Sequence, residues 1–172
     1  MNRITEICTY LMLICSIALS LSQTSMAADN PFDIGGTVTV TRVSDGDSLR
    51  SGALRIRLFG IDAPEIKQVC QYASSIKWPC GVDARDRLIE LVKTAAHLDC
   101  TLRDTDRYGR LVMQCFANHK DIARTLVAEG MAVAYERYAQ DYVAVQAQAR
   151  DAGRGLWAGK FDMPEDWRKV NK

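Results

Sequence analysis

The sequence has little excess charge of either sign and few histidines. Its 172 residues include 22 Lys and Arg against 21 Asp and Glu, which gives a net charge of +1. A chain this close to neutrality has no broad basic footprint, so a polyanionic partner would be held by a local group of charges. The only histidines are His97 and His119, and neither accompanies the acidic residues of the chain. Since a nucleophile-elbow motif is also missing, the sequence argues against a serine hydrolase and against a histidine-based nuclease.

Long apolar runs are scarce as well, and the clearest one covers residues 7–21. It follows Arg3 and precedes small residues that end at Ala27, which is the pattern of a secretory signal. We therefore predict a signal peptide over residues 1–27 and a single domain over residues 28–172. An uncleaved membrane anchor is the alternative, although the run is shorter than the ~20 residues that a span requires. Lipid attachment at Cys15 is less favoured, because Ile14 precedes it where lipoprotein signals have a small residue.

Removal of this segment would leave four cysteines: Cys70, Cys80, Cys100 and Cys115. An even number in an exported domain predicts two disulfides. Three connectivities are possible, but a hairpin that turns around residues 107 and 108 would place Cys100 opposite Cys115, which leaves Cys70 for Cys80. The alternative is a four-cysteine zinc site, which the absence of any Cys-x-x-Cys pair disfavours.

The hydrophobic pattern predicts strands early in the chain and helices mostly later. Alternating residues predict strands at 36–43, around Leu49, and at 54–59, 98–103 and 111–117. Helical spacing and glycine stops predict helices at 82–97, 121–129 and 141–152. Residues 66–81 read as a loop, and the tail carries Trp157, Phe161 and Trp167, enough apolar surface to dock on the domain. This order favours an α+β domain with a small closed antiparallel sheet.

Three short segments carry candidate chemistry. They are Asp45-Gly46-Asp47, residues 57–65 (Arg-Leu-Phe-Gly-Ile-Asp-Ala-Pro-Glu) and residues 106–110 (Asp-Arg-Tyr-Gly-Arg). Carboxylate oxygens suit a Ca²⁺-type ion, and a guanidinium fork can neutralise a phosphorane-like transition state. Each segment alone would most often be a polar turn or a solvated strand. Their conjunction indicates metal-assisted cleavage of a phosphate diester.

Together these segments resemble the staphylococcal nuclease (thermonuclease) family, in its exported proteobacterial form. The arginine lies five residues before the aspartate and eight before the glutamate, as in that family, and the three segments follow in the family's order. The resemblance extends over about residues 36–157. It implies an OB-type five-stranded antiparallel β-barrel with three α-helices, a fold that commonly accepts nucleic acid on one face.

The resemblance also implies residue roles. Asp47, Asp62 and the backbone carbonyl of Ala63 would bind one Ca²⁺ ion, with alanine where many relatives have threonine. Glu65 would activate or position the attacking water, and Arg57 and Arg110 would bind and stabilise the phosphate. Tyr108 and Tyr135 are candidates for substrate binding through base stacking. For Tyr135 and Tyr138 the register is ambiguous, so core packing is the alternative.

The sequence therefore predicts an exported, Ca²⁺-dependent nuclease, periplasmic or secreted. Its partner would be nucleic acid as substrate, DNA with RNA as a second candidate, cleaved with low sequence specificity. We expect a monomer without membrane attachment after signal cleavage. Two alternatives stay open: a non-catalytic OB-fold binding module of the cell envelope, and a phosphodiesterase acting on a small or non-nucleic substrate. Loss of a carboxylate or an arginine would favour the binding module, and this chain has lost neither.

Overall fold

The computed structural model describes residues 34–171, so the predicted signal peptide lies outside the described residues. The described residues fall within one compact unit, Phe32–Lys172. Within the described part of the chain, no helix is both long enough and apolar enough to cross a bilayer.

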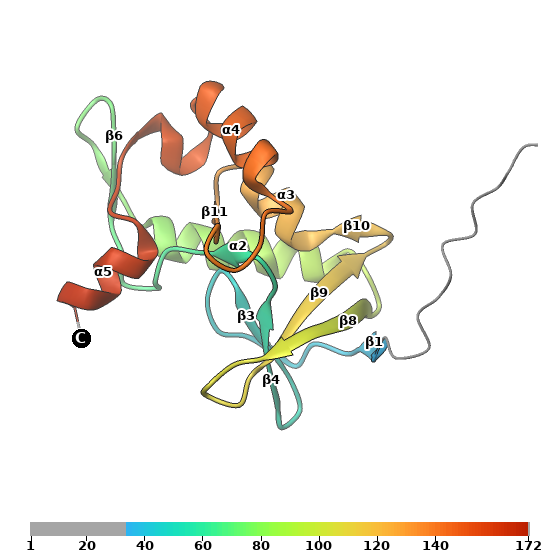
Figure 1. Ribbon diagram of the computed structural model, residues 1–172. Helices are drawn as coiled ribbons and strands as arrows, with labels where there is room; N and C mark the ends of the chain where they lie inside the picture. Colours follow the sequence, from blue (N-terminus) through green and yellow to red (C-terminus); the bar gives the residue numbers. More distant parts are fainter. Residues whose placement is uncertain (1–33, 172) are drawn as a thin grey trace, which may run out of the picture. The chain divides into compact units, whose positions relative to one another are not determined.

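The main sheet has seven strands in the order β1-β8-β9-β4-β3-β2, with β10 paired to β9 (Figure 1). β1 and β2 lie at opposite ends of this order, yet only three residues, 39–41, separate them in the chain. A sheet whose two end strands are nearly continuous in sequence must curl round to bring its ends together, which produces the OB-like barrel. The strand expected at 36–43 is therefore two strands that pair with different partners. The bounds are β1 Gly35–Val38, β2 Arg42–Val43, β3 Ser48–Ser51, β4 Leu54–Leu58, β8 Leu98–Thr105, β9 Leu111–Ala117 and β10 Lys120–Asp121.

The α+β, OB-like architecture agrees with the prediction, while three details differ from it. The main sheet has seven strands where five were expected. The β4–β9 pair is parallel, so the sheet is mixed where an antiparallel one was expected. Parallel neighbours need a long crossover, and the chain between β4 and β9, which includes α2 and β8, supplies it. The described residues also form four α-helices where three were expected: α2 Cys80–Lys93, α3 Ile122–Ala128, α4 Val143–Asp151 and α5 Pro164–Val170.

Two smaller sheets complete the domain. β5 (Ile61–Asp62) pairs with β11 (Val133–Ala134), and β6 (Cys70–Tyr72) lies between β7 (Lys77–Trp78) and β12 (Gly159–Lys160). The segment expected as a loop at 66–81 therefore contains a short β-hairpin. A 3-10 turn, Gly155–Ala158, leads into β12. In Figure 1, α2 crosses the middle of the molecule, with most strands of the main sheet below it and α3 and α4 above.

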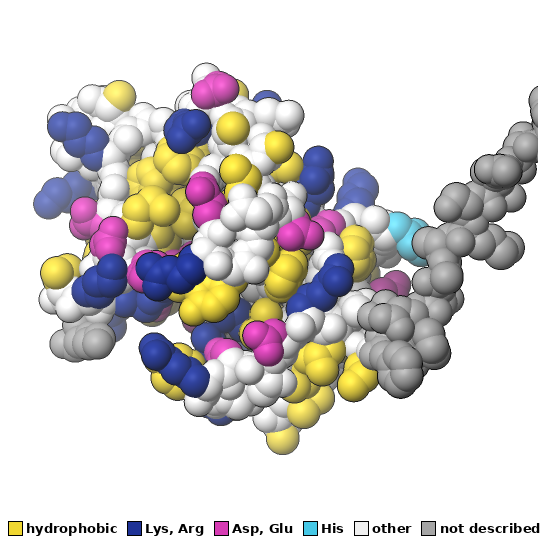
Figure 2. Space-filling view, in the orientation of Figure 1, with side chains coloured by type: hydrophobic (Ala, Val, Ile, Leu, Met, Phe, Trp, Pro, Cys, Tyr) yellow, Lys and Arg dark blue, Asp and Glu magenta, His cyan; other side chains and the backbone are white. Residues whose placement is uncertain are grey.

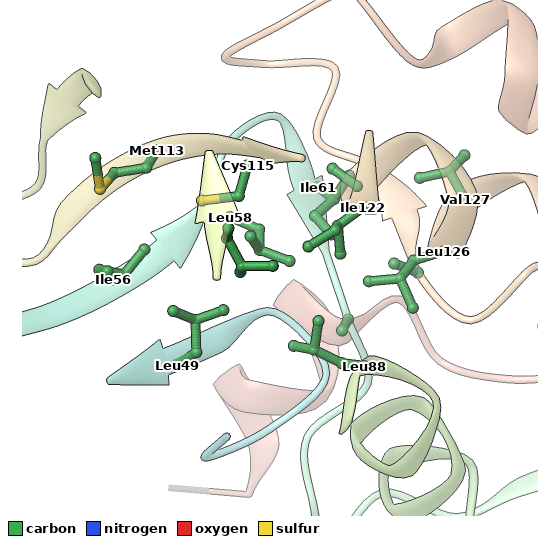
Figure 3. Packing of buried hydrophobic residues seen from close by; sticks show 14 of the residues in the cluster. Leu49, Ile56, Leu58, Ile61, Leu88, Met113, Cys115, Ile122, Leu126 and Val127 are labelled. Carbon is green, nitrogen blue, oxygen red and sulfur yellow. The ribbon is translucent and has the colours of Figure 1, made fainter. Parts of the chain in front are cut away.

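The main core lies where the sheet meets α2 and α3. Figure 3 shows Leu88 of α2 near Leu49, and Ile122 of α3 near Ile61. These side chains are at most 1% exposed. A second cluster joins the β6–β7 hairpin to the tail and consists of Cys70, Trp78, Cys80, Val133 and Leu156, with Trp157 and Phe161 packed against it. The tail thus docks through two of the three aromatic residues expected to do so.

Two disulfides connect the cysteine pairs expected from the sequence, Cys70–Cys80 and Cys100–Cys115. Cys100 and Cys115 are directly opposite in the β8–β9 ladder, with their Cα atoms 4.1 Å apart. Both pairs are buried. The Cys70–Cys80 bond closes the segment that precedes α2.

Replacing Cys100 and Cys115 together by alanine should lower the free energy of unfolding by about 3 kcal/mol, because the bond closes a loop of 15 residues in the unfolded chain. Urea unfolding followed by circular dichroism measures the change. The Cys70→Ala, Cys80→Ala pair, with a separation of 10 residues, provides a comparison. If the Cys100→Ala, Cys115→Ala protein unfolded at the same urea concentration as the disulfide-intact wild type, this prediction would be wrong.

Candidate active site

The Asp45-Gly46-Asp47 turn leads into β3 and is pressed against two other elements. A Cβ atom added at Gly46 would lie 2.7 Å from the Cβ of Ala63 and 2.8 Å from that of Ala84 in α2. Such distances are not tolerated, so only glycine lets the turn approach both neighbours. The close approach brings Asp47 next to the segment that follows β5.

Arg57 of β4 joins the two aspartates. Its Nη1 donates to Asp47 Oδ1 at 2.8 Å, and its Nη2 donates to Asp62 Oδ1 at 2.7 Å. The three side chains are only 13%, 4% and 2% exposed, respectively. Burial alone would lower the pKa of Arg57, but Asp47 and Asp62 raise it above its usual range. The guanidinium therefore stays charged and holds both carboxylates in place.

Asp47 has a hydrogen-bond partner at each oxygen. Oδ1 accepts from the Ser48 hydroxyl at 2.9 Å as well as from Arg57, and Oδ2 accepts from the backbone N–H of Ala63 at 2.9 Å. Burial raises the pKa of Asp47, but Arg57 and the Ala63 N–H outweigh it and hold the pKa below its usual value. The side chain is thus an anion held directly beside Ala63.

Asp45 lies at the edge of the same group. Its Oδ1 accepts from the backbone N–H of Asp47 at 3.2 Å. Burial and the neighbouring negative charge of Asp47 raise its pKa from 3.8 to about 7. The Asp45 carboxyl therefore keeps its proton to a higher pH than a free aspartic acid, because a second buried negative charge beside Asp47 is unfavourable.

Glu65 follows β5 and is positioned through its backbone. A Cβ atom at Gly81, in the first turn of α2, would lie 1.8 Å from the Glu65 carbonyl oxygen, so the helix start lies directly on this segment. Gln68, which is 1% exposed, accepts from the Glu65 N–H at 3.2 Å and donates to the Asp162 carbonyl at 2.7 Å. The glutamate side chain itself is 31% exposed, within reach of solvent.

Arg168 of α5 completes the group, and the sequence did not indicate it. It forms two hydrogen bonds to Asp62, at 2.9 and 3.0 Å, and one to Glu65 at 2.9 Å. Burial opposes the charge, but Asp62 and Glu65 raise the pKa of Arg168 above its usual range. We call these five side chains, Asp47, Arg57, Asp62, Glu65 and Arg168, the carboxylate–arginine cluster.

Arg110 belongs to a neighbouring hairpin and has no hydrogen bond to this cluster among the described residues. It immediately precedes β9, where Val112 pairs with Arg57, so it lies on the face of the sheet that Arg57 occupies. Its Nε donates to Asp106 at 2.6 Å, and its guanidinium carbon lies 5.7 Å from the centre of the Tyr108 ring. The tip is also joined to β4, because Arg55 donates to the Tyr108 carbonyl.

The candidate substrate-binding tyrosines are accessible to solvent. Tyr108 at the hairpin tip is 57% exposed and Tyr138 is 67% exposed. Tyr135 is partly buried, and its ring centre lies 4.8 Å from that of Tyr138. Core packing of Tyr138, which was the alternative, is therefore wrong.

The donor types of the cluster suit a hard cation such as Ca²⁺, which prefers carboxylate and carbonyl oxygens. The arrangement is held by guanidinium groups: Arg57 and Arg168 together use both oxygens of Asp62. Among residues 34–171, no three His, Cys, Asp or Glu side chains are placed to hold one metal ion. The chemistry of the residues therefore fits the ion, but Asp62 has no oxygen without an arginine partner.

The fold and the cluster define a class: an OB-like barrel carrying buried carboxylates bridged by arginines at the ends of its strands. A family model described as "Staphylococcal nuclease homologue" matches residues 55–159, which is more than half of the chain. The protein belongs to the staphylococcal nuclease homologue family.

Three relatives illustrate the range of this family. An "Uncharacterized endonuclease" of Escherichia coli O157:H7 is 36% identical over 139 residues, which is 77% of this chain and 82% of the relative. A protein of the same description from Haemophilus influenzae is 31% identical over 144 residues, 79% of this chain and 75% of the relative. The "Succinoglycan biosynthesis protein ExoI" of Rhizobium meliloti is 33% identical over 117 residues, 67% of this chain but only 61% of the relative's length.

Proposed function

We propose that this protein is a nuclease that hydrolyses phosphodiester bonds, as its relatives named endonucleases and its family suggest. One observation carries the proposal: Arg57 holds Asp47 and Asp62 together in a buried position, and Glu65 lies at the solvent-exposed edge of the same group. Two buried carboxylates beside a partly exposed one provide ligands for a cation and an acceptor for a proton from water.

Asp47 and Asp62, with the carbonyl of Ala63, would hold Ca²⁺, which supplies charge stabilisation to the phosphoryl oxygens when it is bound. Arg57 binds a phosphoryl oxygen with the guanidinium that now bridges the aspartates. Glu65 accepts a proton from the attacking water or orients that water, because its side chain is the carboxylate of the cluster that reaches solvent. Arg110 stabilises charge on the phosphate from the adjacent hairpin, where Asp106 orients it.

The substrate would be nucleic acid, bound along the face that carries the exposed tyrosines. The guanidinium carbon of Arg107 lies 4.9 Å from the centre of the Tyr108 ring, and the rings of Tyr135 and Tyr138 pack against each other. Aromatic rings that stack on bases contribute ~1–3 kcal/mol per base without sequence preference. On the face shown in Figure 2, basic and acidic side chains are interspersed and form no continuous basic surface. We therefore expect weak, local and sequence-independent binding.

Export is also part of the proposal. Two buried disulfides persist best in an oxidising compartment, and residues 1–27 carry the pattern of a secretory signal. We place the protein in the periplasm or outside the cell.

A phosphodiesterase acting on a small or non-nucleic substrate is the second candidate. The net charge of +1 supports it, because enzymes that act on long polyanions gain from a strong basic footprint. The rhizobial relative carries a name that concerns succinoglycan biosynthesis and does not mention a nuclease.

Cleavage of single- and double-stranded DNA and of RNA by the purified, disulfide-intact protein tests the proposal. We expect cleavage that rises with added Ca²⁺ and stops with EGTA. Bis(p-nitrophenyl) phosphate, assayed in parallel, reports hydrolysis of a small diester. Cleavage of the small diester without cleavage of either nucleic acid would favour the second candidate, and no hydrolysis of any substrate with any divalent ion would refute both.

A further inference from the structure

Arg168 occupies the oxygens that the proposed cation would need. Its Nη2 donates to Asp62 Oδ2 at 2.9 Å, and its Nη1 donates to Asp62 Oδ1 at 3.0 Å and to Glu65 Oε1 at 2.9 Å. Asp62 is almost completely buried, whereas the Arg168 side chain is 33% exposed. The guanidinium therefore bridges the buried Asp62 and the partly exposed Glu65.

The helix that carries Arg168 is anchored on the domain. Pro164, the first residue of α5, is buried, and Gln68 binds the Asp162 carbonyl just before the helix. Glu165 pairs with Arg137 at 3.1 Å. These contacts place α5 independently of Arg168. The match to the family model ends at residue 159, so Arg168 lies outside the matched region.

We propose that Arg168 is a tethered competitor of the divalent cation, which sets the affinity of the site by occupying Asp62 and Glu65 until the cation displaces it. This inference rests on the proposed function, because it takes Asp62 as a cation ligand. Asp62 Oδ1 is shared between Arg57 and Arg168, but Oδ2 is bonded by Arg168 alone. A cation that binds Asp62 therefore approaches an oxygen that Arg168 already bonds, where the two positive charges repel each other.

The competition has a definite direction. Without the cation, Arg168 neutralises the negative charge of Asp62 and Glu65, and so stabilises the fold. With the cation bound, part of that charge is already neutralised, so the ion pairs that hold Arg168 weaken and its partly exposed side chain is released into solvent at a smaller cost. Removal of Arg168 should lower the stability of the cation-free protein and lower the Kd for the cation.

Calcium binding measured by isothermal titration calorimetry, without nucleic acid, tests the inference on the full-length disulfide-intact protein. For Arg168→Gln we expect a Kd about tenfold lower than that of the wild type, equivalent to about 1.4 kcal/mol. We also expect a lower Tm without Ca²⁺ and a larger Tm rise on its addition. Arg168→Lys keeps the charge but cannot bind in a fork, so its Kd should be lower by a smaller factor.

Lys169→Gln is the matched control, since Lys169 pairs with Glu165 and Asp166 of its own helix and, among residues 34–171, with no carboxylate of the cluster; its Kd should equal that of the wild type. Asp62→Asn should abolish binding. If Arg168→Gln binds Ca²⁺ no more tightly than the wild type, the competition is refuted while the cation site stands. If neither the wild type nor Arg168→Gln binds Ca²⁺, both the cation site and the competition are refuted. Should Arg168→Gln not fold, the Kd of Arg168→Lys decides the question in the same way.

Discussion

Replacing Arg57 by alanine is expected to lower the rate of DNA cleavage about a thousandfold and the free energy of unfolding by about 3 kcal/mol. The rate falls because the proposed mechanism assigns to this guanidinium the binding of a phosphoryl oxygen. The stability falls because Asp47 loses its ion-pair partner while it is only 4% exposed. Arg168 still pairs with Asp62, which keeps the loss at the lower end of the range for a broken buried pair.

Single-turnover cleavage at saturating Ca²⁺ and urea unfolding measure the two effects. Arg55→Ala is a matched control from the same strand, since Arg55 is exposed and donates to the Tyr108 carbonyl. It should change the unfolding free energy by less than about 1 kcal/mol. An Arg57→Ala protein that unfolds like the wild type would show that Asp47 needs no partner, and full cleavage activity would remove Arg57 from the mechanism.

Replacing Glu65 by glutamine is expected to lower kcat on the order of 10²–10⁴-fold, with KM and stability nearly unchanged. The amide keeps the size of the side chain but can no longer accept a proton from water. Its bond from Arg168 is at the 31% exposed rim of the cluster, where loss of one ion pair costs about 1 kcal/mol or less. The effect should therefore fall on catalysis rather than on folding.

Steady-state cleavage of a fluorescent oligonucleotide separates kcat from KM. Glu90→Gln makes the same chemical change on an exposed side chain of α2 that pairs with Arg87, and it should leave both constants unchanged. Retention of the wild-type kcat by Glu65→Gln would exclude Glu65 as proton acceptor.

The local elements were predictable because their side chains alternate or recur at a fixed spacing. The β8–β9 hairpin, its Cys100–Cys115 pair and the α2, α3 and α4 helices all appear where short-range patterns place them, with ends shifted by a few residues. The direction and partnership of strands that lie far apart in the sequence were not predictable. Nothing in the residues of β4 or β9 indicates that they run parallel, because a strand pattern reports which face is buried and not which neighbour covers it.

The candidate site likewise contains residues that the sequence indicated and residues that only the structure revealed. Asp47, Arg57, Asp62 and Glu65 were identified in two short segments through their resemblance to the staphylococcal nuclease family, and the structure brings them together. Arg168 was missed because it lies 106 residues from Asp62 in a tail read only for its apolar packing residues. Gln68 was missed for a related reason, since a buried amide that joins two backbone segments has no sequence signature.

The sequence by itself determined the types of side chain available for chemistry and the local elements that carry them, because both depend on neighbours within a few residues. Only the tertiary structure decided which charges face one another. The curl of the sheet brings β3, β4 and β5 together, the close contacts at Gly46 and Gly81 set the positions of Asp47 and Glu65, and the docking of α5 adds a second arginine to Asp62. These contacts join residues far apart in the chain, and their energies depend on distance in space, which a single sequence does not report.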